Sequence, residues 1–250
     1  MHHYFIENEN VVSTDAVCFP IKFADADKNH VNAQRLKIGE HITAVDKSAN
    51  YFELKIEDFK DGEVFAKIAT KRNYPKSKFQ LALYQGVSKN TKLDDVLRAT
   101  TEIGISRFCA VNMERSVAII KKDSESKKLE RFYAVARSAA MQSGRGEIPE
   151  CCVLSNFEDL LNDLKILELL LVFWEKADAE DTVEKALSNL EGVKKVGVLI
   201  GPEGGISENE IDQLKAMGKC KICTLGNTIL RTETAGIAST AIVKHLLDGV

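Results

Sequence analysis

The sequence predicts an α/β protein in which a small β-rich domain precedes a larger domain of alternating strands and helices. Segment 41–70 holds three short runs of β-branched and aromatic residues, separated by turn residues such as Asp61-Gly62. From Lys76 onward, short apolar runs alternate with helical patterns, as in a layered α/β fold. The segment KRNYP, residues 71–75, breaks the first pattern. We therefore predict domains at residues 1–73 and 74–250.

The expected elements follow one another regularly. The spacing in the first domain is typical of a small barrel or sandwich. In the second domain, the patterns predict helices at 91–104, closed by Gly104, and at 124–144, with apolar residues at helical spacing. Short apolar runs typical of parallel strands buried on both faces complete the domain. The predicted strands are 79–86, 107–111, 169–173, 196–200 and 222–225.

Composition excludes some classes of protein. Hydrophobic residues make up 44% of the 250 residues and the net charge is −3, as in a globular protein. No apolar run approaches the roughly 20 residues needed to span a bilayer. The start MHHYFIENEN lacks the features of a signal peptide. Among the six cysteines, Cys220 and Cys223 form a C-x-x-C pair, but neither a second pair nor histidines at ligand spacing lie nearby. We therefore expect a cytoplasmic chain with reduced thiols, no bound metal and no membrane partner.

Charge is unevenly distributed. Residues 76–150 hold 14 Lys+Arg against 9 Asp+Glu, whereas residues 151–250 hold 10 against 16. A basic segment in an acidic protein is typical of a polyanion-binding surface. Charge alone favours the other interpretation, a solvated helix face, and leaves both open.

A glycine-rich turn interrupts the second domain at VLIGPEGGISENEI, residues 198–211. It follows a predicted strand, and Ser207 with Glu210 forms the capping box of a helix. The turn matches neither the P-loop nor the dinucleotide-binding pattern. Because it lies at the carboxyl end of a predicted parallel strand, we expect it to bind a ligand.

A second loop, TLGNTILRTETAGIA at residues 224–238, has the same design. A strand ends near Gly226, a short loop follows, and Thr232 is placed to cap a helix of small and branched residues. Arg231 stands just before that helix. Either loop alone is also compatible with an ordinary turn and N-cap.

Together, the two loops resemble those of the methyltransferases that modify N3 of a uridine in 16S ribosomal RNA, within the SPOUT superfamily. Four further segments resemble that family: RLKIGE at 35–40, EIG at 102–104, ERS at 114–116, and QSGR at 142–145 followed by Pro149-Glu150. Four positions depart from its pattern: His3 and Ala99 replace an arginine and a lysine, and Asn227-Thr228 replace Pro-Arg. The spacing from His30 to Arg35 is also one residue shorter than in that family.

The resemblance implies a PUA-like, RNA-binding β-barrel at 1–73 and a SPOUT domain with a deep trefoil knot at 74–250. It also implies a homodimer, S-adenosylmethionine as methyl donor, and 16S rRNA or the small ribosomal subunit as partner. The RNA-binding residues it implies are Arg35, Lys37, Arg115, Gln142 and Arg145. The cofactor-binding residues it implies are Ile200, Gly201, Glu203, Gly204, Leu225, Gly226, Ile229, Leu230, Arg231, Thr232, Thr234 and Ala235.

Arg231 and Glu203 are the candidate catalytic residues. Loss of the uracil N3 proton spreads negative charge over the flanking carbonyl oxygens, and a fixed cation would stabilise it. Arg231 suits this role because it does not readily deprotonate; alternatively, it pairs with Glu203 or Glu233 and holds the knot. Glu203 acts either as a base or, as we prefer, in ordering the loop.

Two other classes of function remain open. The chain is compatible with an RNA-binding module whose knotted domain serves dimerisation without catalysis. It is also compatible with an unrelated α/β enzyme that uses a nucleotide. Binding of S-adenosylmethionine discriminates between these classes.

Overall fold

The computed structural model describes residues 1–11, 18–27, 31, 34–74, 77–89 and 92–249. The chain divides into two units, residues 1–76 with 140–147 and residues 77–139 with 148–250. The second domain was predicted to be continuous from residue 74, whereas in the structure residues 140–147 pack with the first unit.

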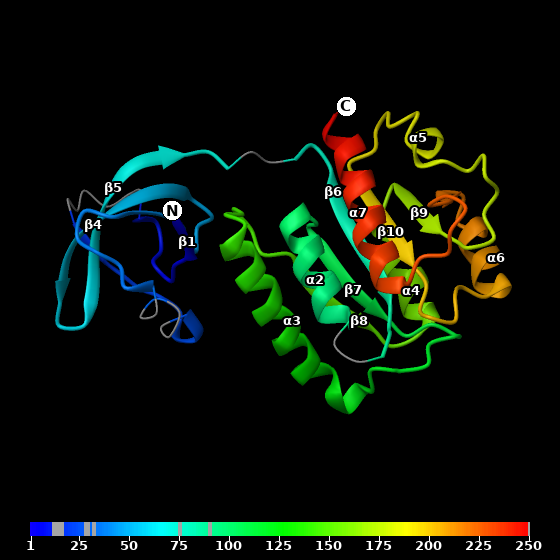
Figure 1. The fold of residues 1–250 in the computed structure, drawn as a ribbon, viewed down its shortest axis with the longest axis horizontal. Helices are drawn as coiled ribbons and strands as arrows, with labels where there is room; N and C mark the ends of the chain where they lie inside the picture. Colours follow the sequence, from blue (N-terminus) through cyan, green and yellow to red (C-terminus); the bar gives the residue numbers. More distant parts are fainter. Residues whose placement is uncertain (12–17, 28–30, 32–33, 75–76, 90–91, 250) are drawn as a thin grey trace. The chain divides into compact units, whose positions relative to one another are not determined.

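The first unit is built on one five-stranded sheet, drawn in blue and cyan in Figure 1. Strands β1 and β3 are parallel, and the other pairs are antiparallel. An isolated bridge between Ile6 and Phe23 lies beyond the two edge strands, so the sheet curls toward closure. A β-rich first domain is thus confirmed. In sheet order the strands are β1 (His2–Phe5), β3 (His41–Val45), β4 (Tyr51–Lys60), β5 (Glu63–Arg72) and β2 (Phe19–Ile21); a 3-10 turn, η2, covers Asp25–Asp27.

Segment 140–147 is held in this unit by His3. The ring Nε2 lies 2.8 Å from the Arg145 carbonyl oxygen, and Nδ1 lies 2.8 Å from the Thr43 hydroxyl. Tyr51 stacks on the same ring. Burial lowers the pKa of His3 to about 4, against the opposing effect of the Arg145 carbonyl. The imidazole is therefore neutral at pH 7, donating from Nε2 to the carbonyl and accepting from the Thr43 hydroxyl at Nδ1.

The second unit contains a six-stranded sheet whose neighbouring strands are all parallel. Because β10 pairs with both β9 and β6, the strand order reverses next to it. Open α/β sheets bind ligands beside such a reversal. In sheet order the strands are β11 (Cys220–Cys223), β9 (Leu169–Phe173), β10 (Lys195–Ile200), β6 (Gln80–Gly86), β7 (Arg107–Val111) and β8 (Glu150–Leu154).

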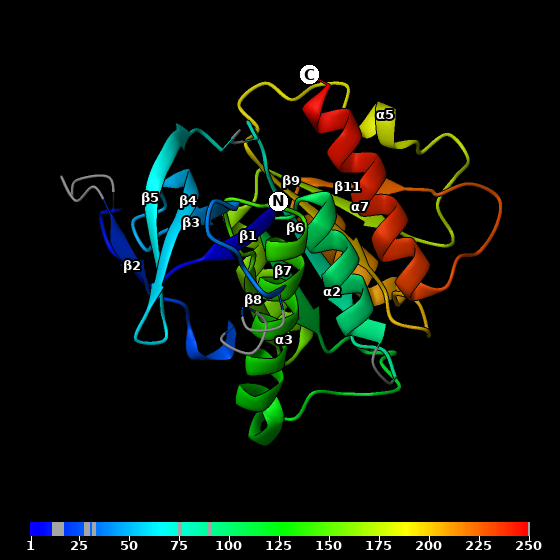
Figure 2. The ribbon, with the colours of Figure 1, turned by 60° about the vertical axis from the view of Figure 1, so that its left-hand side comes forward.

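Apolar residues alternate between the two faces of this sheet. Along β9, Leu169, Leu171 and Phe173 join one core, whereas Leu170 and Val172 join the other. Side chains of α2, α3 and α7 complete the first core, and those of α4 and α6 complete the second. Figure 2 shows α2 and α7 side by side over the strands. The helices are α2 (Lys92–Ile103), α3 (Lys122–Gln142), α4 (Phe157–Asp163), α5 (Val183–Ala186), α6 (Glu208–Ala216) and α7 (Thr232–Asp248), with a 3-10 turn, η3, at Leu164–Ile166.

Most predicted elements of this unit are confirmed, and two strands match the prediction residue for residue. The last strand is two residues earlier than predicted, since Cys220 pairs with Leu170 and the ladder ends at Cys223. Thr224 then turns the chain by accepting the Gly226 N–H at its hydroxyl. Strand β8 and helices α4 and α5 were not predicted.

The expectation that all cysteines are reduced is wrong for one pair. Cys109 and Cys152 form a disulfide between register partners on β7 and β8. Burial raises the pKa of the free Cys151 and Cys223 thiols to about 12. Within the described residues, His, Cys, Asp and Glu form no cluster suited to a metal ion, and no helix there is long and apolar enough to cross a bilayer.

Candidate active site

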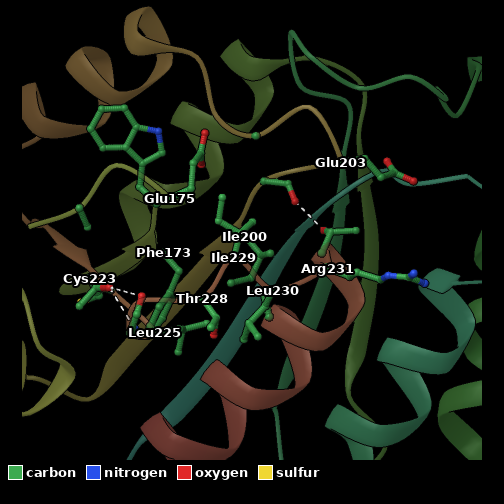
Figure 3. Close-up of a pocket in the computed structure, with 18 of the residues that line it drawn as sticks. Phe173, Glu175, Ile200, Glu203, Cys223, Leu225, Thr228, Ile229, Leu230 and Arg231 are labelled. Carbon is green, nitrogen blue, oxygen red and sulfur yellow. Dashed lines mark hydrogen bonds between the residues drawn. The ribbon is translucent and has the colours of Figure 1, made fainter. Parts of the chain in front are cut away.

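A cavity of about 740 Å³ opens at the carboxyl ends of β9, β10 and β11. Three loops line it, following Phe173, Ile200 and Cys223, as Figure 3 shows. Its volume lies within the usual range for small-molecule sites. All predicted cofactor residues line it except the exposed Thr234. Those lining it are Ile200, Gly201, Glu203, Gly204, Leu225, Gly226, Ile229, Leu230, Arg231, Thr232 and Ala235.

The glycines of the first loop are required by the protein's own packing. A Cβ on Gly204 would lie 2.6 Å from the Arg115 carbonyl oxygen, and one on Gly201 would lie 2.8 Å from Ile206 Cγ1. Neither contact is possible for a real Cβ. The turn is therefore wedged against neighbouring segments, independently of any ligand.

Gly226 in the second loop has a different requirement. Its φ is +101°, a conformation that residues with a Cβ adopt at a cost. Nothing lies within 4 Å of the position where a Cβ would stand. Backbone conformation, and not crowding, therefore makes glycine necessary here.

Thr232 joins the two loops. Its hydroxyl donates to the Gly201 carbonyl oxygen at 2.6 Å and accepts from Gln85 Nε2 at 2.8 Å. The predicted N-cap role of Thr232 is wrong: α7 begins at Thr232, and Arg231 occupies the cap position without a side-chain cap bond. The hydroxyl is instead committed to holding the glycine turn against β6 and α7.

Glu203 is bonded to the protein backbone. Its Oε1 accepts the Lys89 N–H at 3.0 Å. This bond ties the glycine turn to the segment after β6, which is the ordering role preferred from the sequence. Its role in the reaction stays a prediction.

Arg231 is exposed and forms no salt bridge within the part of the chain that the structure describes. Neither alternative pairing of Arg231 is present among the described residues: Glu203 accepts the Lys89 N–H, and Glu233 pairs with Lys92 at 3.1 Å. Figure 3 places Arg231 and Glu203 on one side of the cavity, away from Phe173. The guanidinium is therefore available to an anionic group.

Glu233, in the first turn of α7, is paired with Lys92. Burial raises the pKa of Glu233, but a bond from its own backbone N–H, the Lys92 ammonium and the Arg231 charge together lower it. Glu233 is therefore ionised at neutral pH and engaged by Lys92. No carboxylate of the described residues bonds directly to Arg231.

The third loop was missed by the sequence analysis. It brings Phe173, Trp174 and Glu175 to the cavity. Trp174 Nε1 donates to the Ile206 carbonyl oxygen at 3.2 Å, so this loop also supports the glycine turn. The sequence could have indicated this loop as part of the site, because the predicted strand 169–173 ends at the same edge of the sheet.

Apolar side chains line another part of the cavity. Phe173, Leu225 and Leu230 contribute to the lining, while Ile229 is 86% exposed at its mouth. A flat apolar group can pack on such surfaces. This composition suits a ligand with one aromatic portion and several polar atoms.

The predicted RNA-binding residues are divided between the two units. Arg115 belongs to the second unit, where Nη1 donates to the Gly204 carbonyl oxygen at 3.5 Å. In the first unit Arg35, Lys37 and Gln142 are exposed. Arg145 is buried, and Nη2 lies 3.3 Å from Glu147 Oε1. A phosphate contact by the Arg145 side chain would require it to move.

Comparison with known proteins places this site in a family. A family model described as an RNA methyltransferase domain matches residues 75–244. The chain is 31% identical over 221 residues to ribosomal RNA small subunit methyltransferase E 2 of Borreliella burgdorferi, covering 87% of each protein. It is 26% identical over 249 residues to ribosomal RNA small subunit methyltransferase E of Bacillus subtilis, covering 98% of this chain and 96% of that protein.

Solved structures share the fold along nearly the whole chain. One, described as a hypothetical protein, is similar with a TM-score of 0.84 at 25% identity, covering 98% of each chain. Another is ribosomal RNA small subunit methyltransferase E from Neisseria gonorrhoeae bound to S-adenosyl methionine, with a TM-score of 0.77 at 24% identity and 98% coverage of each chain. The chain belongs to the RNA methyltransferase domain family and, within it, to the family of ribosomal RNA small subunit methyltransferase E.

Proposed function

We propose that this chain methylates N3 of a specific uridine in 16S rRNA with S-adenosylmethionine as donor. The observation that supports this most is the convergence of two glycine loops at the carboxyl ends of three parallel strands, beside an Arg231 that forms no salt bridge with any described residue. Membership of an rRNA methyltransferase family supports the reaction class. The N3 position rests on the resemblance of the two loops.

The cavity fits the donor chemically. Its volume suits a nucleoside-sized ligand, and its lining combines apolar side chains with exposed backbone of the glycine turn. The groups that would hold the adenosine portion are Leu225, Ile229 and Leu230 with the backbone at Gly201 and Gly226. When bound, S-adenosylmethionine supplies a methyl group activated by a sulfonium.

The residues of the chain then have separate tasks. Thr232 and Glu203 keep the glycine turn in place through bonds to Gly201 and Lys89. Arg231 stabilises the negative charge on the uracil carbonyl oxygens as N3 gives its proton to water. Positioning by the walls of the cavity supplies a large share of the rate, since methyl transfer needs the nucleophile in line with the bond that breaks.

The quaternary and RNA-binding features are part of the same proposal. We infer a homodimer, a PUA-like first domain that binds RNA, and a SPOUT domain with a trefoil knot. Exposed Arg35, Lys37, Gln142 and Arg115 are the proposed RNA contacts. An rRNA substrate implies a cytoplasmic site of action, with free rRNA or the small subunit as partner.

One experiment tests the assignment. Small-subunit rRNA from cells lacking the gene is incubated with the purified protein and labelled donor, then digested and analysed by mass spectrometry. The expected product is 3-methyluridine at one position. Donor binding without any methylated nucleoside would contradict the enzyme assignment, and absence of donor binding would favour an RNA-binding module.

A further inference from the structure

The loop after β7 is bonded to the segment that follows the glycine turn. Ser207 Oγ donates to Glu114 Oε2 at 2.7 Å, and the Glu114 N–H donates to Glu210 Oε1 at 2.9 Å. Glu210 Oε2 accepts the Ser207 N–H at 2.9 Å, and Ser207 Oγ accepts the Glu210 N–H. A capping box on α6 is thus extended by a carboxylate from a segment about 90 residues earlier in the sequence.

In these bonds both the N–H and the hydroxyl of Ser207 have a hydrogen-bond partner. The Ser207 hydroxyl has one proton, which it gives to Glu114, and it accepts the Glu210 N–H. The Glu210 carboxylate, 2% exposed, accepts backbone N–H groups from two different segments. An ordinary capping box needs only the serine and Glu210. The Glu114 side chain is therefore an addition that the helix alone does not require.

The next residue carries the link to the cavity. The Arg115 carbonyl oxygen lies so close to Gly204 that a Cβ there would be 2.6 Å away, and Arg115 Nη1 donates to the Gly204 carbonyl oxygen. Gly204 lines the cavity. Displacement of the loop at Glu114 would therefore displace the glycine turn, because close-packed atoms leave no room for independent movement.

We propose that Glu114 is a positioning residue for the cofactor turn: its carboxylate, through Ser207, holds residues 201–205 in the shape that binds the methyl donor. This inference rests on the proposed function, because it assumes that S-adenosylmethionine binds in this cavity. It gives the ERS segment a role in donor binding, separate from the RNA contact proposed for Arg115.

The test is calorimetric titration of S-adenosylmethionine into the full chain, with thermal melting of each preparation. Glu114→Ala removes the acceptor and should weaken donor binding about tenfold, the equivalent of one charge-assisted hydrogen bond. Glu114→Gln retains an acceptor oxygen and should bind within about threefold of the parent. The control is Glu208→Ala on the same helix, whose exposed carboxylate pairs with Lys176 and takes no part in these bonds; it should bind as the parent does.

A second variant tests the same bond at little cost to the helix. Ser207→Gly removes the hydroxyl at a cap position where glycine costs only a few tenths of a kcal/mol relative to serine. It should weaken donor binding to a similar extent, and adding Glu114→Ala to it should weaken binding no further.

The outcomes are distinguishable. Parent-like affinity in folded Glu114→Ala overturns the inference, as does a full further loss when Glu114→Ala is added to Ser207→Gly. If Glu114→Ala does not fold, the affinity of Ser207→Gly for the donor decides between the outcomes. Parent-like donor binding by Ser207→Gly then overturns the inference. Failure of the parent to bind the donor overturns the proposed function itself.

Discussion

Replacing Arg231 by alanine tests whether the exposed guanidinium acts in the reaction or only in the fold. Within the described residues Arg231 forms no salt bridge and no side-chain cap bond. Arg231→Ala therefore leaves no carboxylate unpaired, and we expect the free energy of unfolding to change by no more than about 0.5 kcal/mol.

The expected effect on the reaction is much larger. A preorganised group that stabilises charge mainly in the transition state contributes roughly 3–4 kcal/mol. Arg231→Ala should therefore lower the single-turnover methylation rate about a hundredfold to a thousandfold. Arg231→Lys keeps the charge without the planar fork and should recover part of the rate.

The assay combines three measurements on one preparation: thermal stability, donor affinity and single-turnover methylation of unmethylated small-subunit rRNA. Thr232→Val is the structural comparison. It removes the donor to the Gly201 carbonyl oxygen and leaves Gln85 Nε2 only its 3.5 Å bond to the Thr232 carbonyl oxygen. It should lose about 1–3 kcal/mol of stability. An Arg231→Ala rate within about threefold of the parent would refute the catalytic role, and a parallel loss of stability and rate would refute the separation of the two roles.

Three further predictions concern RNA, the cofactor loop and pH. Lys127 and Lys128 lie on α3, in the basic segment 76–150 that is a candidate polyanion-binding surface. Lys127→Ala should lower the slope of log affinity for RNA against log salt by about 1, whereas Lys128→Ala should lower it less, because Lys128 pairs with Asp94. Equal slopes for the two variants in salt titrations of RNA binding would contradict this. Gly226→Val should abolish donor binding in a folded protein, since φ is +101°, and unchanged affinity by calorimetry would contradict the loop assignment. The His3 pKa is about 4 in the folded state and 6.5 in the reference state, so the unfolded chain binds more protons between these values. The free energy of unfolding should therefore fall by up to about 3 kcal/mol from pH 6.5 to pH 4. His3→Gln, measured by urea unfolding at each pH, should not show this fall. The same pH profile in the variant and the parent would exclude His3 as its source.

The second unit was largely predictable because local patterns and packing agree there. Short apolar runs alternate between the two faces of the sheet, as the residues of β9 show. The capping box of Ser207 and Glu210 was also predicted correctly, because its two residues lie only three positions apart and form a local pattern.

What could not be predicted depends on contacts between distant segments. The spacing near Thr232 fits an N-cap, but Gly201 and Gln85 claim its hydroxyl across the fold. The Glu175 side chain stands in a loop with no recognisable motif, so its place in the cavity follows only from where β9 ends. The bond between Glu114 and Ser207 joins segments 93 residues apart, beyond the reach of any local pattern.

The assignment of residues 140–147 to the first unit has a consequence for cutting the chain into fragments. A polypeptide ending near residue 74 would lack the Arg145 carbonyl that His3 bonds and the Met141 side chain that packs on its core. A polypeptide beginning near residue 75 would contain residues 140–147 but lack the β-sheet of the first unit on which they pack. The two units are thus interleaved in the gene, and neither is encoded as one uninterrupted stretch. Transplanting the first unit onto another protein would require both stretches of coding sequence.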